Sequence, residues 1–210
     1  EHLQHFEPFT RKNIPLVFFD RVAALGACTQ VLIDNRKAGY EATRHLIEQG
    51  CRNLLHITAT SKRNVYADRL EGFRQALEEA GLPFQPDQVL VTSLGAGAGA
   101  EAAAAILRLP ERPDGIFVAN DNCAAACLMA LKKAGLRIPE DIAIAGFNND
   151  PVCTVVEPNL TTIHYPGQEM GEAAARHLVN HLDGASGPAR TETILLRSEL
   201  IVRASSLRVG

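Results

Sequence analysis

Several features are scarce or missing in this chain of 210 residues. It contains no uninterrupted run of about 18 apolar residues, which a membrane-spanning helix requires. It has no leader that passes from basic to apolar to small residues, so we expect neither a membrane span nor a signal peptide. Positive charge is not in excess either, because the net charge is −3. This balance argues against direct binding of nucleic acid by the chain itself.

Motifs for catalysis and metal binding are also missing. The seven histidines are scattered, and we find no nucleophile triad, no metal-ligand cluster and no paired carboxylates. The sequence therefore predicts no enzyme, no catalytic residue and no bound metal. The cysteines form no CxxC pair, which favours small core residues in a reducing cytosol over redox or metal use and predicts a cytoplasmic protein. They are Cys28, Cys51, Cys123, Cys127 and Cys153.

Strand and helix signals alternate along nearly the whole chain. The strands are short and apolar throughout rather than alternating, which is typical of a parallel sheet covered by helices on both faces. They are expected at Leu16–Phe19, Val31–Ile33, Leu54–Thr58, Val89–Thr92, Gly115–Ala119, Ile142–Ala145 and Ile194–Leu196. Helices with recognisable caps or stops are expected at Asn35–Gln49, Val65–Ala80, Ala98–Leu109, Asn122–Ala134 and Pro166–Leu182. The fold class is α/β, built of doubly wound parallel sheets.

The middle of the chain holds a full series of strand–helix units, whereas the first stretch supplies only two or three strands. We therefore expect two lobes, the first of them incomplete. The partial N-terminal lobe is expected to contain residues 1–59 and 161–187. The C-terminal lobe, expected to bind the ligand, would contain residues 60–160 and 188–210.

The glycine-rich run Gly95–Ala100 formally satisfies the dinucleotide-binding pattern G-x-G-x-x-A. Such a fingerprint belongs in the first strand–helix turn, with an acidic residue ending the next strand. Here at least three strands precede it, and the next strand ends in Val118-Ala119-Asn120. An Ala-rich helix opening with a loose turn is the preferred interpretation, and no cofactor is predicted.

The most informative segment is GLRIPEDIAIAGFNN (Gly135–Asn149), followed by NLTTI. It predicts a helix end, a turn, a buried strand and then two side-chain amides, Asn148 and Asn149. Ligands of open parallel sheets bind just beyond the carboxyl ends of the strands. These amides are therefore candidates for ligand contact.

Six motifs in order resemble the effector domains of the LacI/GalR (lac-repressor-like) transcription regulators, which share the periplasmic-binding-protein fold. They are IPLVFFDR, VLIDNRKAGYEATRHLIEQGCRNLLHI, RLEGF, PDGIFVANDNCAA, the closing NLTTI with EMGEAAARHL, and LIVRASS. A complete regulator of this kind would begin with a DNA-binding headpiece and the rest of the first lobe. The polar start EHLQHFEPF lacks an initiator Met, so we expect a fragment of a longer protein.

The resemblance implies a set of effector-binding residues. They are Asp20, Arg21, Arg63, Arg69, Asn120, Asp121, Asn148 and Tyr165. The family's usual Asp-Asp pair is Asn148-Asn149 here. Since an amide both donates and accepts hydrogen bonds, the class of ligand stays open.

Structural roles compete with these assignments. We expect Arg69 to point into a wet cleft. Its competing structural role is a surface ion pair with Asp68 or Glu71. Asn120 and Asp121 suit a plain helix N-cap. Asp20 and Arg21 would form a salt bridge within their own loop.

The predicted function is effector sensing and dimerisation in a bacterial repressor. A sugar or related metabolite would bind in the cleft between the lobes and control DNA binding. The partners would be this metabolite, a second copy of the chain in a homodimer, and operator DNA contacted through a headpiece absent from this chain. The alternative is a periplasmic sugar-binding protein of a transporter, which shares the fold.

Overall fold

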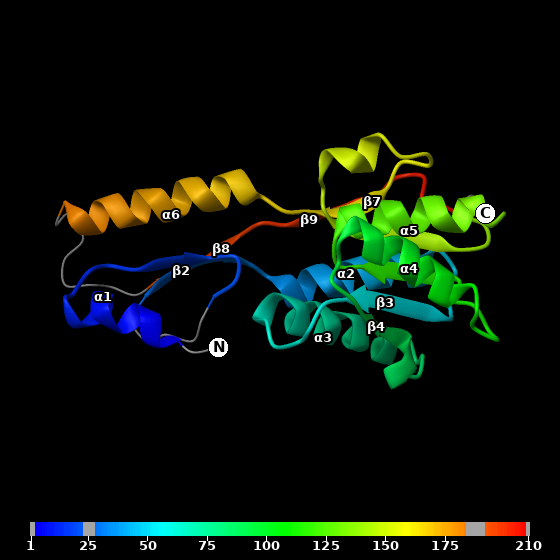
Figure 1. Ribbon diagram of the computed structural model, residues 1–210, viewed down its shortest axis with the longest axis horizontal. Coiled ribbons are helices and arrows are strands. Elements are labelled where there is room, and N and C mark those ends of the chain that lie inside the picture. The colour runs from blue at the N-terminus through cyan, green and yellow to red at the C-terminus, as the bar shows by residue number, and fades with distance from the viewer. Residues whose placement is uncertain (1–2, 23–27, 184–191, 209–210) are drawn as a thin grey trace. The chain divides into compact units, whose positions relative to one another are not determined.

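A computed structural model of the chain describes residues 3–22, 28–183 and 192–208. The backbone forms two compact units, and Figure 1 labels most of their helices and strands. The first unit contains Glu1–Asp34 and Pro166–Arg197, and the second contains Asn35–Tyr165 and Ser198–Gly210. Each unit has its own sheet, so no continuous sheet runs through both in the described residues.

The first unit is a three-stranded parallel sheet covered by a long helix. The sheet has the order β1 (Val17–Phe19), β2 (Thr29–Ile33) and β8 (Thr193–Leu196). The helix α6 (Gly167–Leu182) packs against β1 and β2 and buries Met170 and Ala174. Two short elements, η1 (Leu3–Phe6) and α1 (Glu7–Arg11), precede the sheet and were not predicted from sequence.

The second unit is built on a six-stranded sheet. Its order is β4 (Val89–Val91), β3 (Leu54–Thr58), β5 (Gly115–Val118), β6 (Ala143–Asn148), β7 (Thr161–His164) and β9 (Glu199–Ile201). All pairings are parallel except that of β9, an antiparallel edge strand that the periodicity did not predict. All residues of β3 and β5 are buried, as expected for strands covered on both faces.

Helices cover both faces of this sheet. Leu55 and Ile57 of β3 join a core with the helices α4 (Ala96–Ile106) and α5 (Asp121–Lys133). On the other face, His56 stacks against Phe73 of α3 (Asn64–Glu79), and α3 packs along α2 (Asn35–Glu48). Alternate residues of one strand thus face different helix pairs. Two one-turn helices, η2 (Pro86–Gln88) and η3 (Pro151–Thr154), complete the unit.

Glycine lets the paired helices approach closely. A Cβ atom at Gly72 would collide with the backbone oxygen of Arg36, and one at Gly39 would collide with that of Arg69. Gly99 meets the backbone oxygen of Cys123 in the same way where α4 crosses α5. The glycine-rich run that resembles a nucleotide fingerprint therefore includes a helix-packing glycine, in agreement with the preferred interpretation of that run.

The expected α/β class and all predicted strands and helices are present. The division into lobes, however, differs from the expected one. Residues 35–59 belong to the second unit, because β3 pairs with β4 and β5 and α2 packs on α3. The strand β7 also belongs there, paired with β6, whereas β8 pairs with β2 in the first unit. The expected boundary at residue 187 lies outside the described residues.

Candidate functional site

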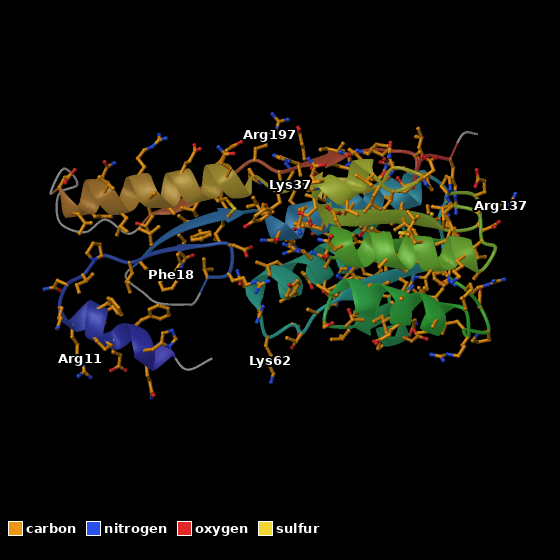
Figure 2. All side chains as sticks on the ribbon, turned by 45° about the horizontal axis from the view of Figure 1, so that its top comes forward. Arg11, Phe18, Lys37, Lys62, Arg137 and Arg197 are labelled. Carbon is orange, nitrogen blue, oxygen red and sulfur yellow. The ribbon has the colours of Figure 1, made fainter. Side chains whose placement is uncertain are left out.

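The strand order of the second unit defines one edge as the candidate site. The chain passes from β3 outward to β4 and then crosses to β5 on the other side of β3. At such a switch point, ligands bind beyond the carboxyl ends of the two central strands. Figure 2 marks this end of the unit by Lys62, in the loop after β3, and the opposite end by Arg137. We call it the carboxyl edge, formed by the residues that follow β3, β5, β6 and β7.

Arg69 lies beneath this edge rather than in open solvent. The residue is only 4% exposed, so the expectation of a wet environment was wrong. The Nε atom donates to Asn35 Oδ1 at 2.9 Å, and Nη1 donates to the Ala119 carbonyl at 3.1 Å. The guanidinium carbon lies 3.5 Å from the ring centre of Phe147. Arg69 therefore joins α2, α3, β5 and β6 below the switch point.

Asn120 and Asp121 open α5 and have different surroundings. Asn120 is the N-cap, and its Oδ1 accepts from the backbone N–H of Cys123 at 3.1 Å. Its Nδ2 atom lies at the carboxyl edge and makes no hydrogen bond to any residue that the structure describes. Asp121 is fully buried, and this burial raises the pKa of its carboxyl group. The hydrogen bonds that the carboxylate accepts act in the opposite direction and lower the pKa in part.

Both oxygens of Asp121 are used inside the protein. Oδ2 accepts from the backbone N–H of Asp150 at 2.9 Å, and Oδ1 accepts from the Thr162 hydroxyl at 2.7 Å. A Cβ atom at Gly146 would collide with this carboxylate, which explains why glycine precedes Phe147. Asp121 thus connects α5, the loop after β6 and β7.

The two amides at the end of β6 have unusual backbones. Asn148 and Asn149 have φ angles of 125° and 61°, in the left-handed region that asparagine tolerates better than most residues. Asn149 is held by its side chain, because its Oδ1 accepts from Arg203 Nη2 at 2.8 Å. Asn148 donates through Nδ2 to Asp150 Oδ2 at 3.4 Å. Asp150 and Arg203 were missed because neither lies in a motif that pointed to the site.

Arg63 and Tyr165 also lie at the carboxyl edge. Arg63 is the residue before α3, and its carbonyl accepts from the backbone N–H groups of Tyr66 and Ala67. Its half-buried side chain makes no hydrogen bond or ion pair within the described residues. Tyr165 follows β7, and its backbone N–H donates to the Asn148 carbonyl at 3.3 Å. The edge therefore brings Arg63, Asn120, Asn148 and Tyr165 onto one end of the second unit.

Asp20 and Arg21 belong to the first unit and follow β1. Asp20 has a φ angle of 61°, and its Oδ2 lies 3.7 Å from Arg21 Nε. This is the ion pair within the loop that was considered as their structural role. Their contact with a ligand stays a prediction.

Two buried polar groups in β3 were not singled out from the sequence. Thr58 ends the strand, is 2% exposed, and its hydroxyl has no hydrogen-bond partner within the described residues. His56 lies between the rings of Phe73 and Phe117, and its Nδ1 is 3.0 Å from the Phe117 carbonyl oxygen. Burial lowers the pKa of His56 to about 4, so the ring is neutral at pH 7.

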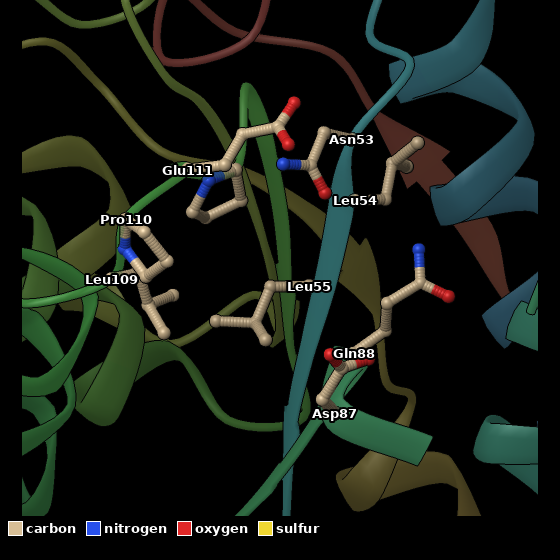
Figure 3. Close-up of a pocket in the computed structure, with 9 residues that line it drawn as sticks. Asn53, Leu54, Leu55, Asp87, Gln88, Leu109, Pro110 and Glu111 are labelled. Atoms are coloured by element: carbon tan, nitrogen blue, oxygen red, sulfur yellow. The ribbon is translucent and has the colours of Figure 1, made fainter. Parts of the chain in front are cut away.

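A hollow of about 280 Å³ lies at the other end of the sheet (Figure 3). Asn53 and Leu54, at the start of β3, and Gln88, just before β4, help to line it. Its position at the amino-terminal ends of the strands separates it from every predicted site residue. Among the described residues, no helix is long and apolar enough to cross a membrane, and no three metal-ligating side chains gather.

Comparisons with known proteins match most of the chain. A family model described as a periplasmic binding protein-like domain matches residues 43–206. The chain is 32% identical over 206 residues to the HTH-type transcriptional regulator DegA of Bacillus subtilis (strain 168). That match covers 98% of this chain and 60% of the relative. The chain thus spans less than two thirds of the length of the curated protein.

Solved structures are similar over most of the chain. A complex of the transcriptional regulator CelR with cellobiose has a TM-score of 0.86 and 30% identity, covering 94% of this chain and 60% of that one. A LacI family transcriptional regulator from Enterococcus faecium with bound ribose has a TM-score of 0.89 and 26% identity. The second match covers 99% of this chain and 76% of that one.

Proposed function

Because the chain belongs to the LacI family of transcription regulators, through a periplasmic-binding-protein-like domain, we propose that it senses a small neutral metabolite, a sugar or a close relative. The effector would contact the carboxyl edge of the second unit. The similar proteins are transcription regulators, not enzymes, and two of them were solved with cellobiose and ribose. A transporter's periplasmic sugar-binding protein is less favoured for the same reason.

The polar side chains of the carboxyl edge are the main support for this proposal. Asn120 Nδ2 and the Arg63 guanidinium are donors without hydrogen-bond partners in the described residues, next to the switch point of the sheet. A polyhydroxylated ligand offers oxygen acceptors for such donors. Asp121 is not included in the proposed contact set, because both its oxygens already accept hydrogen bonds inside the protein.

Control of DNA binding would follow from effector binding. In this proposal the whole regulator works in the cytoplasm, and its headpieces, outside this sequence, contact the operator. An effector changes operator affinity only by binding one conformation of the protein more tightly than the other. A homodimer would place two headpieces on two operator half-sites. For this 210-residue chain by itself, we expect the first unit to take part in association, since the edge strands β1 and β8 of its described sheet offer unpaired backbone groups.

The experiment is a thermal-shift screen of the full-length regulator against ribose, cellobiose, other sugars, sugar phosphates and nucleosides, followed by calorimetry. A ligand at about 100 times its dissociation constant should stabilise the protein by about 2.7 kcal/mol. The binding ligand should also change the affinity of the regulator for operator DNA. Binding without any effect on DNA affinity would favour the transporter-type function. Absence of any stabilising metabolite in the screen would contradict the proposal.

A further inference from the structure

The amide of Asn148 has a fixed orientation. Its Nδ2 donates to Asp150 Oδ2 at 3.4 Å. A carboxylate accepts hydrogen bonds and cannot donate them, so only the nitrogen of the amide is compatible with this position. If the amide were reversed, its carbonyl oxygen would face the carboxylate oxygen at the same distance, and the two partial negative charges would repel. The Oδ1 atom of Asn148 is therefore turned away from Asp150.

The carboxylate that orients this amide is itself held in place. The backbone N–H of Asp150 donates at 2.9 Å to Asp121, whose side chain is fully buried. Asn122 donates through Nδ2 to the same Asp150 oxygen at 3.2 Å. Asp150 is therefore fixed at both its backbone and its side chain, and it cannot turn away from Asn148 without breaking one of these bonds.

The neighbouring amide is oriented in the opposite sense and is fully used. Arg203 can only donate, so Asn149 must offer it Oδ1, at 2.8 Å. The Nδ2 atom of Asn149 then lies 3.4 Å from Nδ1 of His164. By contrast, Oδ1 of Asn148 has no hydrogen-bond partner within the described residues, and the residue is half-buried at the carboxyl edge. Of the two amides, Asn148 thus offers a free acceptor.

We propose that Asp150 is a positioning residue that makes Asn148 an obligate hydrogen-bond acceptor, so that the effector places a neutral donor, a hydroxyl group, against Asn148 Oδ1. This inference rests on the proposed effector-binding function. The sequence left the polarity of this position open, because an amide donates as well as accepts. The oriented amide accepts as a carboxylate would, but it carries no charge to attract an amine.

The first test needs no ligand. Carboxyl and side-chain amide resonances of the protein, labelled with ¹³C and ¹⁵N, are followed while the pH is lowered. The Nδ2 protons of Asn148 should shift together with the Asp150 carboxyl carbon, and this response should disappear in Asp150→Ala. Asn148 protons that ignore the protonation of Asp150 would overturn the orientation, whatever the protein binds.

The second test is a double-mutant cycle with ribose and cellobiose as probes, measured by calorimetry. In the wild-type background, Asp150→Ala should weaken binding about fivefold, the range of one neutral hydrogen bond. Asn148→Asp places a second carboxylate beside Asp150 Oδ2 and should weaken binding through their repulsion, although either of its oxygens can accept a hydrogen bond. In that background, Asp150→Ala should have no weakening effect, because a carboxylate needs no orientation. Asp87→Ala, at the far end of the sheet, is the matched control.

The outcomes separate the two proposals. Equal weakening by Asp150→Ala in both backgrounds would show a merely structural role and overturn the positioning role. If wild type binds neither sugar, ribose and cellobiose are excluded as effectors, while the resonance experiment still decides the orientation of Asn148. The inference is supported if Asp150→Ala weakens binding only in the wild-type background and the Asn148 amide protons shift when Asp150 is protonated.

Discussion

The neutral histidine in the core of the second unit should make the protein sensitive to mild acid. His56 is fully buried between Phe73 and Phe117 and has one partner, the Phe117 carbonyl, for Nδ1. Its Nε2 has no hydrogen-bond partner within the described residues, so a proton added there would be buried and unpaired. Burial, opposed by the bond to Phe117 and aided by the charge of Arg69, lowers the pKa to about 4.

The sign and size of the effect follow from this lowered pKa. The unfolded chain takes up a proton on His56 below about pH 6.5, whereas the folded chain does so only near pH 4. Stability contributed by the neutral ring is therefore complete above pH 6.5 and is lost as the pH falls toward 4. A tenfold change in a protonation equilibrium is worth about 1.4 kcal/mol. The complete loss is then about 3 kcal/mol, of which about 2 kcal/mol is reached at pH 5.

The assay is urea unfolding at pH 8 and pH 5, on either side of the isoelectric point near 6.2, where net charge favours solubility. The protein is compared with His56→Asn, which keeps an amide donor at the position of Nδ1 but does not titrate. The variant is expected to be less stable at pH 8 because it loses ring contacts. Its free energy of unfolding should, however, fall less between the two pH values than that of wild type, by about 2 kcal/mol.

The same loss between pH 8 and pH 5 in wild type and His56→Asn, with unchanged urea dependence, would refute the reasoning. His45 is also buried, and burial lowers its pKa in the same direction. His45→Asn therefore serves as a second comparison. It separates the contribution of His56 from acid sensitivity shared by other buried histidines.

Three further results are expected. Arg69→Ala should lower the free energy of unfolding by about 3 kcal/mol, since it removes charged hydrogen bonds in the core, and unchanged stability in urea would contradict this burial. Thr58→Val should raise stability by about 1 kcal/mol by removing a buried hydroxyl without a hydrogen-bond partner in the described residues, and a loss would reveal a partner for it. The five buried thiols should resist a thiol reagent at pH 8 until urea is added. Burial keeps the reagent away and, for example, raises the pKa of Cys51 to about 12. Rapid labelling of the native protein would argue against their burial.

Much of the fold was predictable because its signals are local. The helix Asn35–Glu48 was expected within one residue, from its first residue and the glycine that follows it. The apolar strands β3 and β5 were also identified, because each is buried on both faces and needs no alternating pattern. The edge strand β9 was missed, since its short run, Glu199–Ile201, is only partly buried and carries little periodicity.

The division into units was not predictable in the same way. The strand β3 follows α2 directly in the sequence, and nothing in its apolar residues indicates which sheet it joins. Its pairing with β4 and β5 is decided by contacts with residues more than 30 positions away. The same reason explains why β8 and β9, separated by only two residues, belong to different sheets.

The sequence by itself determined the family, the class of fold and the position of Asn148 near the end of a buried strand, because motifs and strand ends depend on neighbouring residues. It could not determine what the side chains there contact. Arg69 donates to the Ala119 carbonyl, 50 residues later in the sequence. His56 is neutral because it is buried, in part under the ring of Phe117, which comes 61 residues later. Only the tertiary structure orients Asn148, because the Asp150 carboxylate that selects its nitrogen is held by Asp121 from another element. Hydrogen-bond polarity is a property of the assembled partners rather than of the residue type.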